Sequence, residues 1–245
     1  MDGPSLTFRT VDGRPVPAVN ADQMREVDRI AVEDFGLGIL QMMENAGRNL
    51  AGSAIDMLGP GRGEVVVLAG SGGNGGGGLC CARHLHNHGL RVSVLLSRPP
   101  RDLTGPAAHQ LHILEAAGVR PLEPGDFRGA IGRAWLAVDA LVGYSLRGAP
   151  HGRVAELIAL CNEEARRVLA LDVPSGLDAT SGEAPGIAVR AERTLTLALP
   201  KTGLLGARGE VCLADIGIPP EVCEPLGFSF EWPSPGRTRV PLEIA

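Results

Sequence analysis

The chain contains 245 residues, which is long enough to bury a substantial core in one larger α/β domain without disulfides or metals. Aromatic residues make up only 3% and the formal net charge is −5, which argues against a nucleic-acid binder and against attraction to an anionic membrane. Five cysteines without C-x-x-C spacing, no recognisable leader and no apolar run of about 18 residues make a cytoplasmic protein with small-molecule ligands the expectation.

The first predicted elements are an irregular arm and two helices. Residues 1–19 are polar and rich in proline and glycine, and we expect them to form an N-terminal arm without helix or strand. Helical periodicity begins near Asn20 and predicts one helix over 21–34 and a second over 37–57.

Strands and helices alternate along the rest of the chain. Strands are predicted over 64–69, 91–96, 135–141, 167–173, 193–199 and 210–214, with a short one over 120–122, and helices over 75–88, 103–117 and 152–166. The alternation indicates βαβ units and a mostly parallel sheet with helices on both faces, although little helix separates the last three strands. We expect one α/β domain over residues 20–245, with its core at about 20–220 and a tail from Pro219 that wraps the surface.

A glycine-rich loop, GSGGNGGGG at residues 70–78, joins the first of these strands to the next helix. Glycines let the backbone approach an anion, and the free N–H groups of a helix N-terminus attract it, so the loop indicates a phosphate or pyrophosphate site. Gly70, Gly72 and Gly75 also match the G-x-G-x-x-G dinucleotide fingerprint. The next strand ends in Ser97 and Arg98 instead of the acidic residue that holds a ribose, and Arg98 keeps an NADP-dependent oxidoreductase open as an alternative.

Carboxylates follow the other predicted strands, at the edge where parallel sheets bind ligands. Asp139, Asp172 and Asp178 lie at or just beyond strand ends, where a buried charge needs a cation, a ligand or hydrogen bonds. Asp139, Ser175 and the carbonyl of Asn74 are candidate oxygen ligands of a hard cation. The alternative for each single aspartate is a turn-forming or helix-capping role.

Six segments in order resemble the motifs of the NAD(P)H-hydrate epimerase family, which has the YjeF N-terminal-type domain. They are MENAGRNLA, GSGGNGGGGLCCAR, VDALVGYSLRG, LDVPSGLDATSGE, ALPKTGLL and ADIGIP, and the resemblance covers about residues 20–220. It implies a Rossmann-like three-layer αβα sandwich, usually a homodimer, that interconverts the R and S epimers of hydrated NADH and NADPH. Because the hydrated nucleotide is the substrate, no redox cofactor is expected, and a separate NAD(P)H-hydrate dehydratase is the implied pathway partner.

The resemblance also implies the site residues. Ligand contacts fall on Gly73, Asn74, Gly75, Gly76 and Gly77, on Gly143, Tyr144, Ser145, Leu146, Arg147, Gly148 and Ala149, and on Asp172. The family's potassium site carries over to Asn74, Asp139 and Ser175.

Epimerisation at C6 of the nicotinamide ring requires reversible loss of the hydroxyl through a cationic ring. A carboxylate can protonate the leaving oxygen and later deprotonate the incoming water, and we assign this catalytic role to Asp172. Lys201, the only lysine of the chain, is expected to tune Asp172 or to bind phosphate, and the alternative is a solvated surface lysine.

Two motifs depart from the family pattern. The usual N-N-G-G-D-G reads G-N-G-G-G-G from Gly73, and the usual G-T-G reads Gly143, Tyr144, Ser145. The missing carboxylate at Gly77 raises a second hypothesis, a catalytically silent relative that binds a nucleotide-like ligand or a protein partner through the same cleft.

Three histidines close together in the sequence do not lead us to predict a metal. His84, His86 and His88 include an i, i+4 pair, but we find no acidic or cysteine partner of matching spacing in the sequence.

Overall fold

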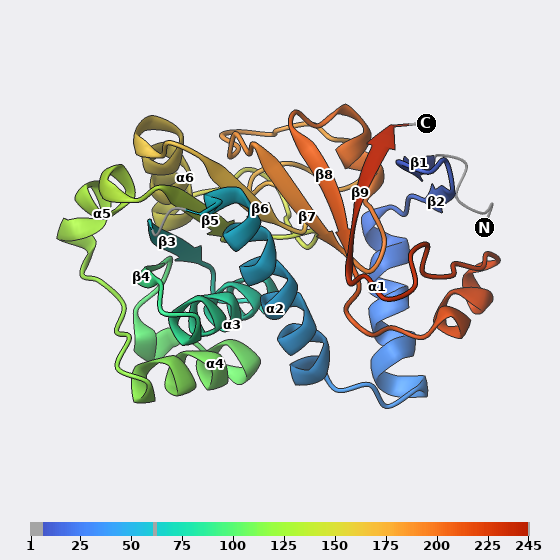
Figure 1. Cartoon of the computed structure of the whole chain (residues 1–245), viewed down its shortest axis with the longest axis horizontal. Coiled ribbons are helices and arrows are strands. Elements are labelled where there is room, and N and C mark those ends of the chain that lie inside the picture. Colours follow the sequence, from blue (N-terminus) through green and yellow to red (C-terminus); the bar gives the residue numbers. More distant parts are fainter. Residues whose placement is uncertain (1–6, 61–62, 245) are drawn as a thin grey trace.

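The structure is a computed structural model, and it describes residues 7–60 and 63–244. Within these residues nine strands form one sheet (Figure 1). Their order across the sheet is β2 (Pro15–Pro17), β1 (Thr7–Thr10), β9 (Arg239–Ile244), β8 (Glu210–Ala214), β7 (Arg193–Leu197), β6 (Val168–Leu171), β5 (Leu136–Ala140), β3 (Glu64–Ala69) and β4 (Arg91–Leu96). All pairings from β4 to β8 are parallel, and those of β9, β1 and β2 are antiparallel.

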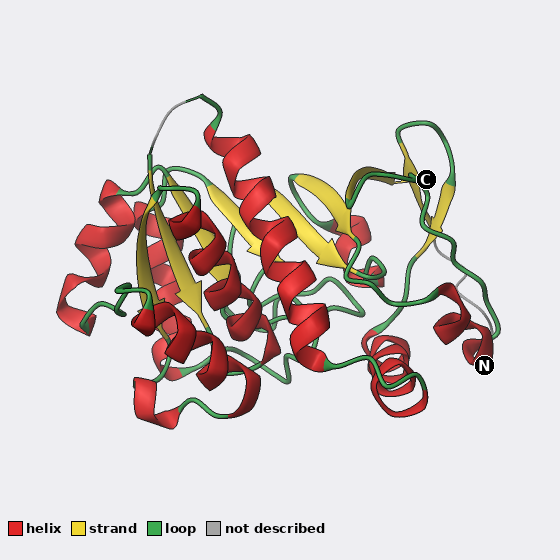
Figure 2. Cartoon of the chain, turned by 60° about the horizontal axis from the view of Figure 1, so that its bottom comes forward, coloured by secondary structure: helices red, strands yellow, loops and turns green. Residues whose placement is uncertain are grey.

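Helices cover both faces of the parallel strands. They are α1 (Ala21–Arg29), α2 (Ile39–Leu58), α3 (Gly73–Asn87), α4 (Gly105–Ala116), α5 (Phe127–Arg133) and α6 (Gly152–Glu164). One apolar core joins α2, α3 and α4 to the sheet, and a second core joins α5 and α6 to it; Figure 2 shows the long helix α2 lying across the strands. The predicted three-layer αβα sandwich is confirmed.

The N-terminal helix has a defined start. The side chain of Asn20 accepts a hydrogen bond from the Gln23 N–H at 2.8 Å, and the Gln23 side chain accepts one from the Asn20 N–H at 2.9 Å. This reciprocal cap satisfies two N–H groups that the first helical turn leaves free. A single π turn over Ile30–Asp34 continues the helix as far as the predicted end at residue 34.

Several local predictions differ from the structure. The strands over 64–69, 91–96 and 210–214 are confirmed with the same bounds, but the short strand over 120–122 is wrong, because only Leu122 donates a backbone hydrogen bond to the sheet, at 2.9 Å to Val94 O. Helix α5 was not predicted. It contains two glycines and is only seven residues long, so its apolar period is short.

The expectation of an arm without regular structure is also wrong for its described part. Residues 1–6 lie outside the described residues, but β1 and β2 form a hairpin and β1 pairs with β9 from the tail. The tail therefore extends the sheet instead of only wrapping the surface. Each of these strands is short, and β1 finds its partner more than 200 residues away, which a local pattern does not reveal.

The strand order creates a crevice at the carboxyl ends of the parallel strands. β3 lies between β4 and β5, so the loop after β3 leads to one side and the loop after β5 to the other. Open parallel sheets bind ligands beyond the carboxyl ends of strands at such a point. Among the described residues, no helix combines the length and the apolar composition that a membrane span requires.

Candidate active site

A cleft of about 230 Å³ lies beyond the ends of β3, β5, β6 and β7 and is closed by α1 and α2. Its polar side is formed by Asp28, Asn74, Tyr144, Asp172 and Lys201, with Gly73, Gly77, Gly143 and Ser145. Its apolar side is formed by Met24, Ile39, Met42, Met43, Ala46, Leu171, Leu197 and Ile216. A larger hollow of about 1060 Å³ along β8 and β9 contains none of the predicted site residues. We therefore take the smaller cleft as the candidate active site.

Asp172 and Lys201 form a buried ion pair in this cleft. The ammonium Nζ of Lys201 lies 2.5 Å from Asp172 Oδ1 and 2.9 Å from the carbonyl oxygen of Leu197. Lys201 is 0% exposed and Asp172 is 3% exposed, so the alternative of a solvated surface lysine is wrong. The other carboxylate oxygen, Oδ2, accepts a hydrogen bond of 3.0 Å from the backbone N–H of Tyr144.

The backbone at the ends of β6 and β7 is strained. Asp172 has a φ of 69° and Ala198 has a φ of 59°, and both are left-handed conformations that residues with a Cβ adopt at a cost. The N–H of Asp172 donates to Leu195 O at 2.7 Å, and that of Ala198 donates to Ala214 O at 3.1 Å, so the sheet holds both conformations. In this backbone conformation the Asp172 carboxylate, at the end of β6, contacts Lys201.

Tyr144 connects this pair to helix α1. Its hydroxyl donates a short hydrogen bond to Asp28 Oδ2, and Lys201 Nζ lies 5.7 Å from the centre of its ring. Burial raises the pKa of Asp28, and burial together with the nearby Asp28 charge raises the pKa of Tyr144. Tyr144 is therefore a hydrogen-bond donor to a second carboxylate in the cleft.

We predict that Tyr144→Phe lowers the free energy of unfolding by about 1–3 kcal/mol, because the half-buried Asp28 loses its hydrogen-bond donor. The ring, and with it the wall of the cleft and the contact with Lys201, is retained. Urea unfolding of the wild type and the variant measures the change. The double variant Asp28→Leu/Tyr144→Phe, which removes both polar groups, should recover part of the loss, and an unchanged stability of Tyr144→Phe contradicts the prediction.

Of the three residues predicted to bind a cation, Asn74 lines the cleft, whereas Asp139 and Ser175 are fully buried and do not line it. Asp139 Oδ1 accepts a hydrogen bond of 2.6 Å from the Ser175 hydroxyl, and Asp139 Oδ2 accepts one of 2.8 Å from the Ser175 N–H. Burial raises the pKa of Asp139 to about 6. The Asn74 amide instead donates to Leu171 O at 3.2 Å, and no hydrogen bond joins it to Asp139 or Ser175 within the described residues. The structure thus brings two of the three together, and the potassium assignment stays a prediction.

Most glycines of the loop are explained by close packing. A Cβ on Gly75 would lie 1.8 Å from Gly70 O, one on Gly76 2.6 Å from the Met43 side chain, and one on Gly78 2.5 Å from Ala140 Cβ. A Cβ on Gly73 would meet nothing within 4 Å among the described residues. The helix begins at Gly73, inside the predicted loop, so Gly75 and Gly76 are buried helical residues that do not line the cleft.

We predict opposite results for two alanine substitutions in this loop. Gly75→Ala should lower the free energy of unfolding by about 1–3 kcal/mol or more, because its methyl group meets backbone that cannot move aside. Gly73→Ala should change it by less than about 0.5 kcal/mol, because its methyl group enters open space. Urea unfolding of both variants tests the prediction, and equal effects would show that the packing argument is wrong.

The second predicted wall is only partly in the cleft. Gly143, Tyr144 and Ser145 line it. Four residues of the predicted wall do not: Leu146 is half-buried, and Arg147, Gly148 and Ala149 are exposed. Ligand contact by these four residues stays a prediction.

Sequence reasoning missed Asp28 and the methionines of α1 and α2. Asp28 lies four residues after buried Met24, so it falls on the apolar face of the predicted helix. The signal that could have identified Asp28 is the presence of a carboxylate on the buried face of an amphipathic helix.

Residues 39–203 match the family described as YjeF-related protein N-terminus. A protein of Dehalogenimonas lykanthroporepellens named NAD(P)H-hydrate epimerase is 51% identical over 228 residues, which cover 91% of this chain and 91% of that protein. The chain belongs to the NAD(P)H-hydrate epimerase family. The resemblance seen in the sequence motifs is thereby confirmed.

Other family members are similar over most of this chain. A Rhodopirellula baltica protein named NAD(P)H-hydrate epimerase is 37% identical, over 84% of this chain and 87% of that protein. A Salinibacter ruber protein named bifunctional NAD(P)H-hydrate repair enzyme Nnr is 40% identical, over 85% of this chain but 42% of that protein. The family domain therefore occurs both alone and within longer repair enzymes.

A solved structure confirms the fold of this chain. The crystal structure of the yeast protein ynu0 covers 92% of this chain and 100% of the yeast chain, with a TM-score of 0.83 at 22% identity. At this identity the similarity supports the fold alone.

Proposed function

We propose that this chain is a cytoplasmic epimerase that interconverts the R and S forms of hydrated NADH and NADPH and so takes part in the repair of these nucleotides. The observation that carries the proposal is the buried pair of Asp172 and Lys201 in the cleft, 2.5 Å apart. The names of the relatives at 51% and 37% identity support the same activity.

Epimerisation requires a group that donates a proton to the leaving hydroxyl and later accepts a proton from the added water. The carboxyl group of Asp172 gives a proton to the C6 hydroxyl, the C–O bond breaks, and water leaves behind a cationic ring. Water then adds to the opposite face of C6 and returns its extra proton to Asp172, so no atom or electron is gained or lost overall. Lys201 passes a proton to the Asp172 carboxylate across their 2.5 Å contact before the C–O bond breaks, and it takes the proton back from Asp172 after water has added, so the ion pair is restored.

The walls of the cleft fit a hydrated dihydropyridine ring. The methionines and Leu171 offer apolar surface for the ring, while Gly73 and Asn74 at the start of α3 present backbone N–H groups toward the phosphates. Exclusion of bulk water by the apolar side would limit reactions of the cationic ring with other nucleophiles.

We propose potassium as the bound ion, with oxygen ligands from Asn74, Asp139 and Ser175. Asp139 is fully buried, and within the described residues no lysine or arginine pairs with it, so a cation would offset the cost of burying its charge. Carboxylate, hydroxyl and amide oxygens are the donors that a hard cation prefers. When bound, the ion would supply a fixed positive charge beside the cleft.

We also propose that the protein is a homodimer whose product is used by a separate dehydratase. Phe35, Ile39 and Leu40 are 47%, 48% and 41% exposed around the connection from α1 to α2, and a dimer interface over this connection would cover these apolar side chains. Light scattering should give twice the chain mass of 25.5 kDa, and a monomer at micromolar concentration would contradict the dimer.

One assay tests the proposed activity against the silent-relative hypothesis. One epimer of hydrated NADH, isolated after acid or heat treatment, is incubated with the protein in potassium buffer, and chromatography follows its conversion to the other. We expect conversion faster than the spontaneous rate, and no acceleration would overturn the proposal. A silent wild type with an active Gly77→Asp variant would instead support the second hypothesis.

A further inference from the structure

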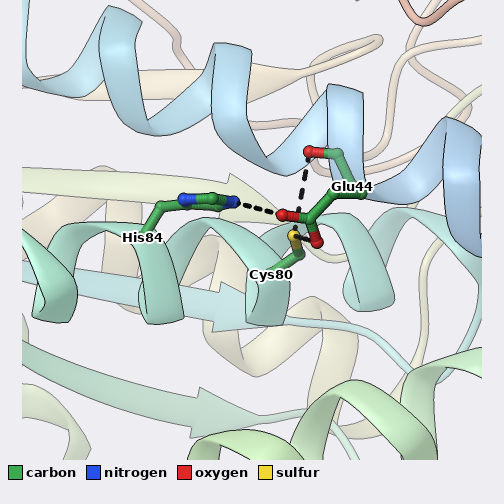
Figure 3. A group of neighbouring side chains, drawn as sticks. All are labelled: Glu44, Cys80 and His84. Atoms are coloured by element: carbon green, nitrogen blue, oxygen red, sulfur yellow. Dashed lines mark hydrogen bonds and ion pairs between the residues drawn. The ribbon is translucent and has the colours of Figure 1, made fainter.

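A cluster of three chemically different side chains lies between α2 and α3, outside the cleft. Figure 3 shows Glu44 reaching from α2 toward Cys80 and His84, which project from successive turns of α3. One ligand atom from each lies within 4.8 Å of the others. None of the three lines the proposed active site.

The helices bring the cluster together by spacing and close approach. Cys80 and His84 are four residues apart on α3, so they share one face of the helix. That face meets α2 closely, because a Cβ on Gly47 would lie 2.4 Å from Cys80 Sγ. Glu44, almost one turn before Gly47 on α2, thus reaches both α3 side chains. Sequence spacing does not reveal Glu44, which lies 40 residues before His84, but Cys80 stands four residues before His84, so the expectation that no cysteine partner has matching spacing is wrong.

The three side chains lie near the spacing that a tetrahedral zinc ion requires. Zinc bonds of about 2.3 Å to sulfur and about 2.0 Å to oxygen and nitrogen place sulfur and oxygen about 3.5 Å apart, and nitrogen and oxygen about 3.3 Å apart. Cys80 Sγ lies 3.4 Å from Glu44 Oε2, and His84 Nε2 lies 2.8 Å from Glu44 Oε1. The two contacts use different oxygens of the carboxylate, and the three ligand atoms lie within 4.8 Å of one another, so an ion could bind after the side chains draw closer together.

Arg83 takes the place of a cation beside this cluster. Its Nη2 contacts Glu44 Oε2 and lies 3.3 Å from Cys80 Sγ. The Arg83 guanidinium is not fully hydrogen-bonded, because its Nε is buried and has no acceptor among the described residues. Displacing this guanidinium from Glu44 costs correspondingly less than displacing one with all its donors satisfied. The Glu44 side chain is 36% exposed and gives an ion access from solvent.

We propose that Glu44, Cys80 and His84 bind one thiophilic divalent transition metal ion, with zinc preferred and water as the fourth ligand. A thiolate and an imidazole select zinc over potassium, magnesium or calcium, so this site differs from the proposed potassium site in ligand chemistry. The bound ion connects α2 to α3 next to Met43, which lines the cleft, and so fixes the distance between one wall of the cleft and the start of α3.

Cobalt is the probe that tests the site. Protein stripped with a chelator and kept in potassium buffer is titrated with Co²⁺, and absorption spectra are recorded. We expect one equivalent to give a thiolate-to-cobalt charge-transfer band in the near ultraviolet together with the visible bands of tetrahedral cobalt. Zn²⁺ should then remove both, and it should raise the thermal unfolding midpoint of the stripped protein.

Matched variants assign the ligands. Cys80→Ser should abolish the charge-transfer band, and Glu44→Gln, a change at a partly exposed residue that keeps the size of the side chain, should weaken cobalt binding at least about tenfold. His86→Ala, on the exposed side of the same helix, and Cys161→Ser, a buried cysteine on α6, should bind like the wild type. Absence of the band in the wild type, its survival in Cys80→Ser, or undiminished binding by Glu44→Gln would overturn the proposal.

Discussion

Asp172→Asn lowers kcat for epimerisation by about 10²- to 10⁴-fold, because asparagine keeps the shape of the side chain but neither delivers nor accepts the proton. The single amide oxygen of asparagine can still accept from the Lys201 ammonium, although the Tyr144 N–H loses its acceptor, so KM should change much less than kcat. Initial rates, corrected for spontaneous conversion, measure the effect. Circular dichroism and thermal unfolding must show that the variant is folded at the assay temperature.

The matched control is Asp178→Asn in the same loop after β6. Asp178 Oδ1 accepts hydrogen bonds from the N–H groups of Thr180 and Ser181 at 2.9 and 2.8 Å, which is the turn-forming role considered for each aspartate. This variant should retain most of the wild-type kcat. If Asp172→Asn kept more than a tenth of the wild-type activity, or if both variants lost it equally, Asp172 would not be the proton carrier.

Lys201→Met lowers the free energy of unfolding by about 3–5 kcal/mol, because it leaves the Asp172 carboxylate buried without its cation. Methionine fills a similar volume, so the change tests charge more than packing. Urea unfolding measures it. The exposed pair of Arg128 and Glu163 supplies the control, since Arg128→Met should cost less than about 1 kcal/mol.

The double variant Asp172→Asn/Lys201→Met separates an ion pair from two independent contacts. Because this variant removes both charges of the pair, it should be more stable than Lys201→Met alone. If the two substitutions were simply additive, the residues would not be energetically coupled, and Lys201 would have no special role in holding Asp172.

The parallel core of the fold was predictable because its signals are local. Strands such as Glu64–Ala69 are buried on both faces and appear as continuous apolar runs, and the helices between them follow with clear periodicity. The antiparallel extension was not predictable in this way. β1 and β2 are short, and the hairpin that they form joins the sheet only through the pairing of β1 with β9, from the opposite end of the chain.

The polar residues of the candidate site could be predicted from the sequence, but the roles of its glycines could not. Strand ends and motif resemblance located Asp172, Lys201, Tyr144 and Asn74, all of which line one cleft. The loop glycines were overinterpreted, since the need for close helix–sheet packing and the need for ligand approach look identical in a sequence. Gly75 serves the first need and Gly73 is free to serve the second.

The most direct test of the central claim is epimer interconversion in water enriched in ¹⁸O. One pure epimer is converted by the protein, and mass spectrometry of the product measures the oxygen at C6. The mechanism predicts accelerated conversion with one solvent oxygen incorporated per inversion, and loss of that acceleration in Asp172→Asn. Conversion no faster than the spontaneous rate, or accelerated inversion that retains the original oxygen, would contradict it.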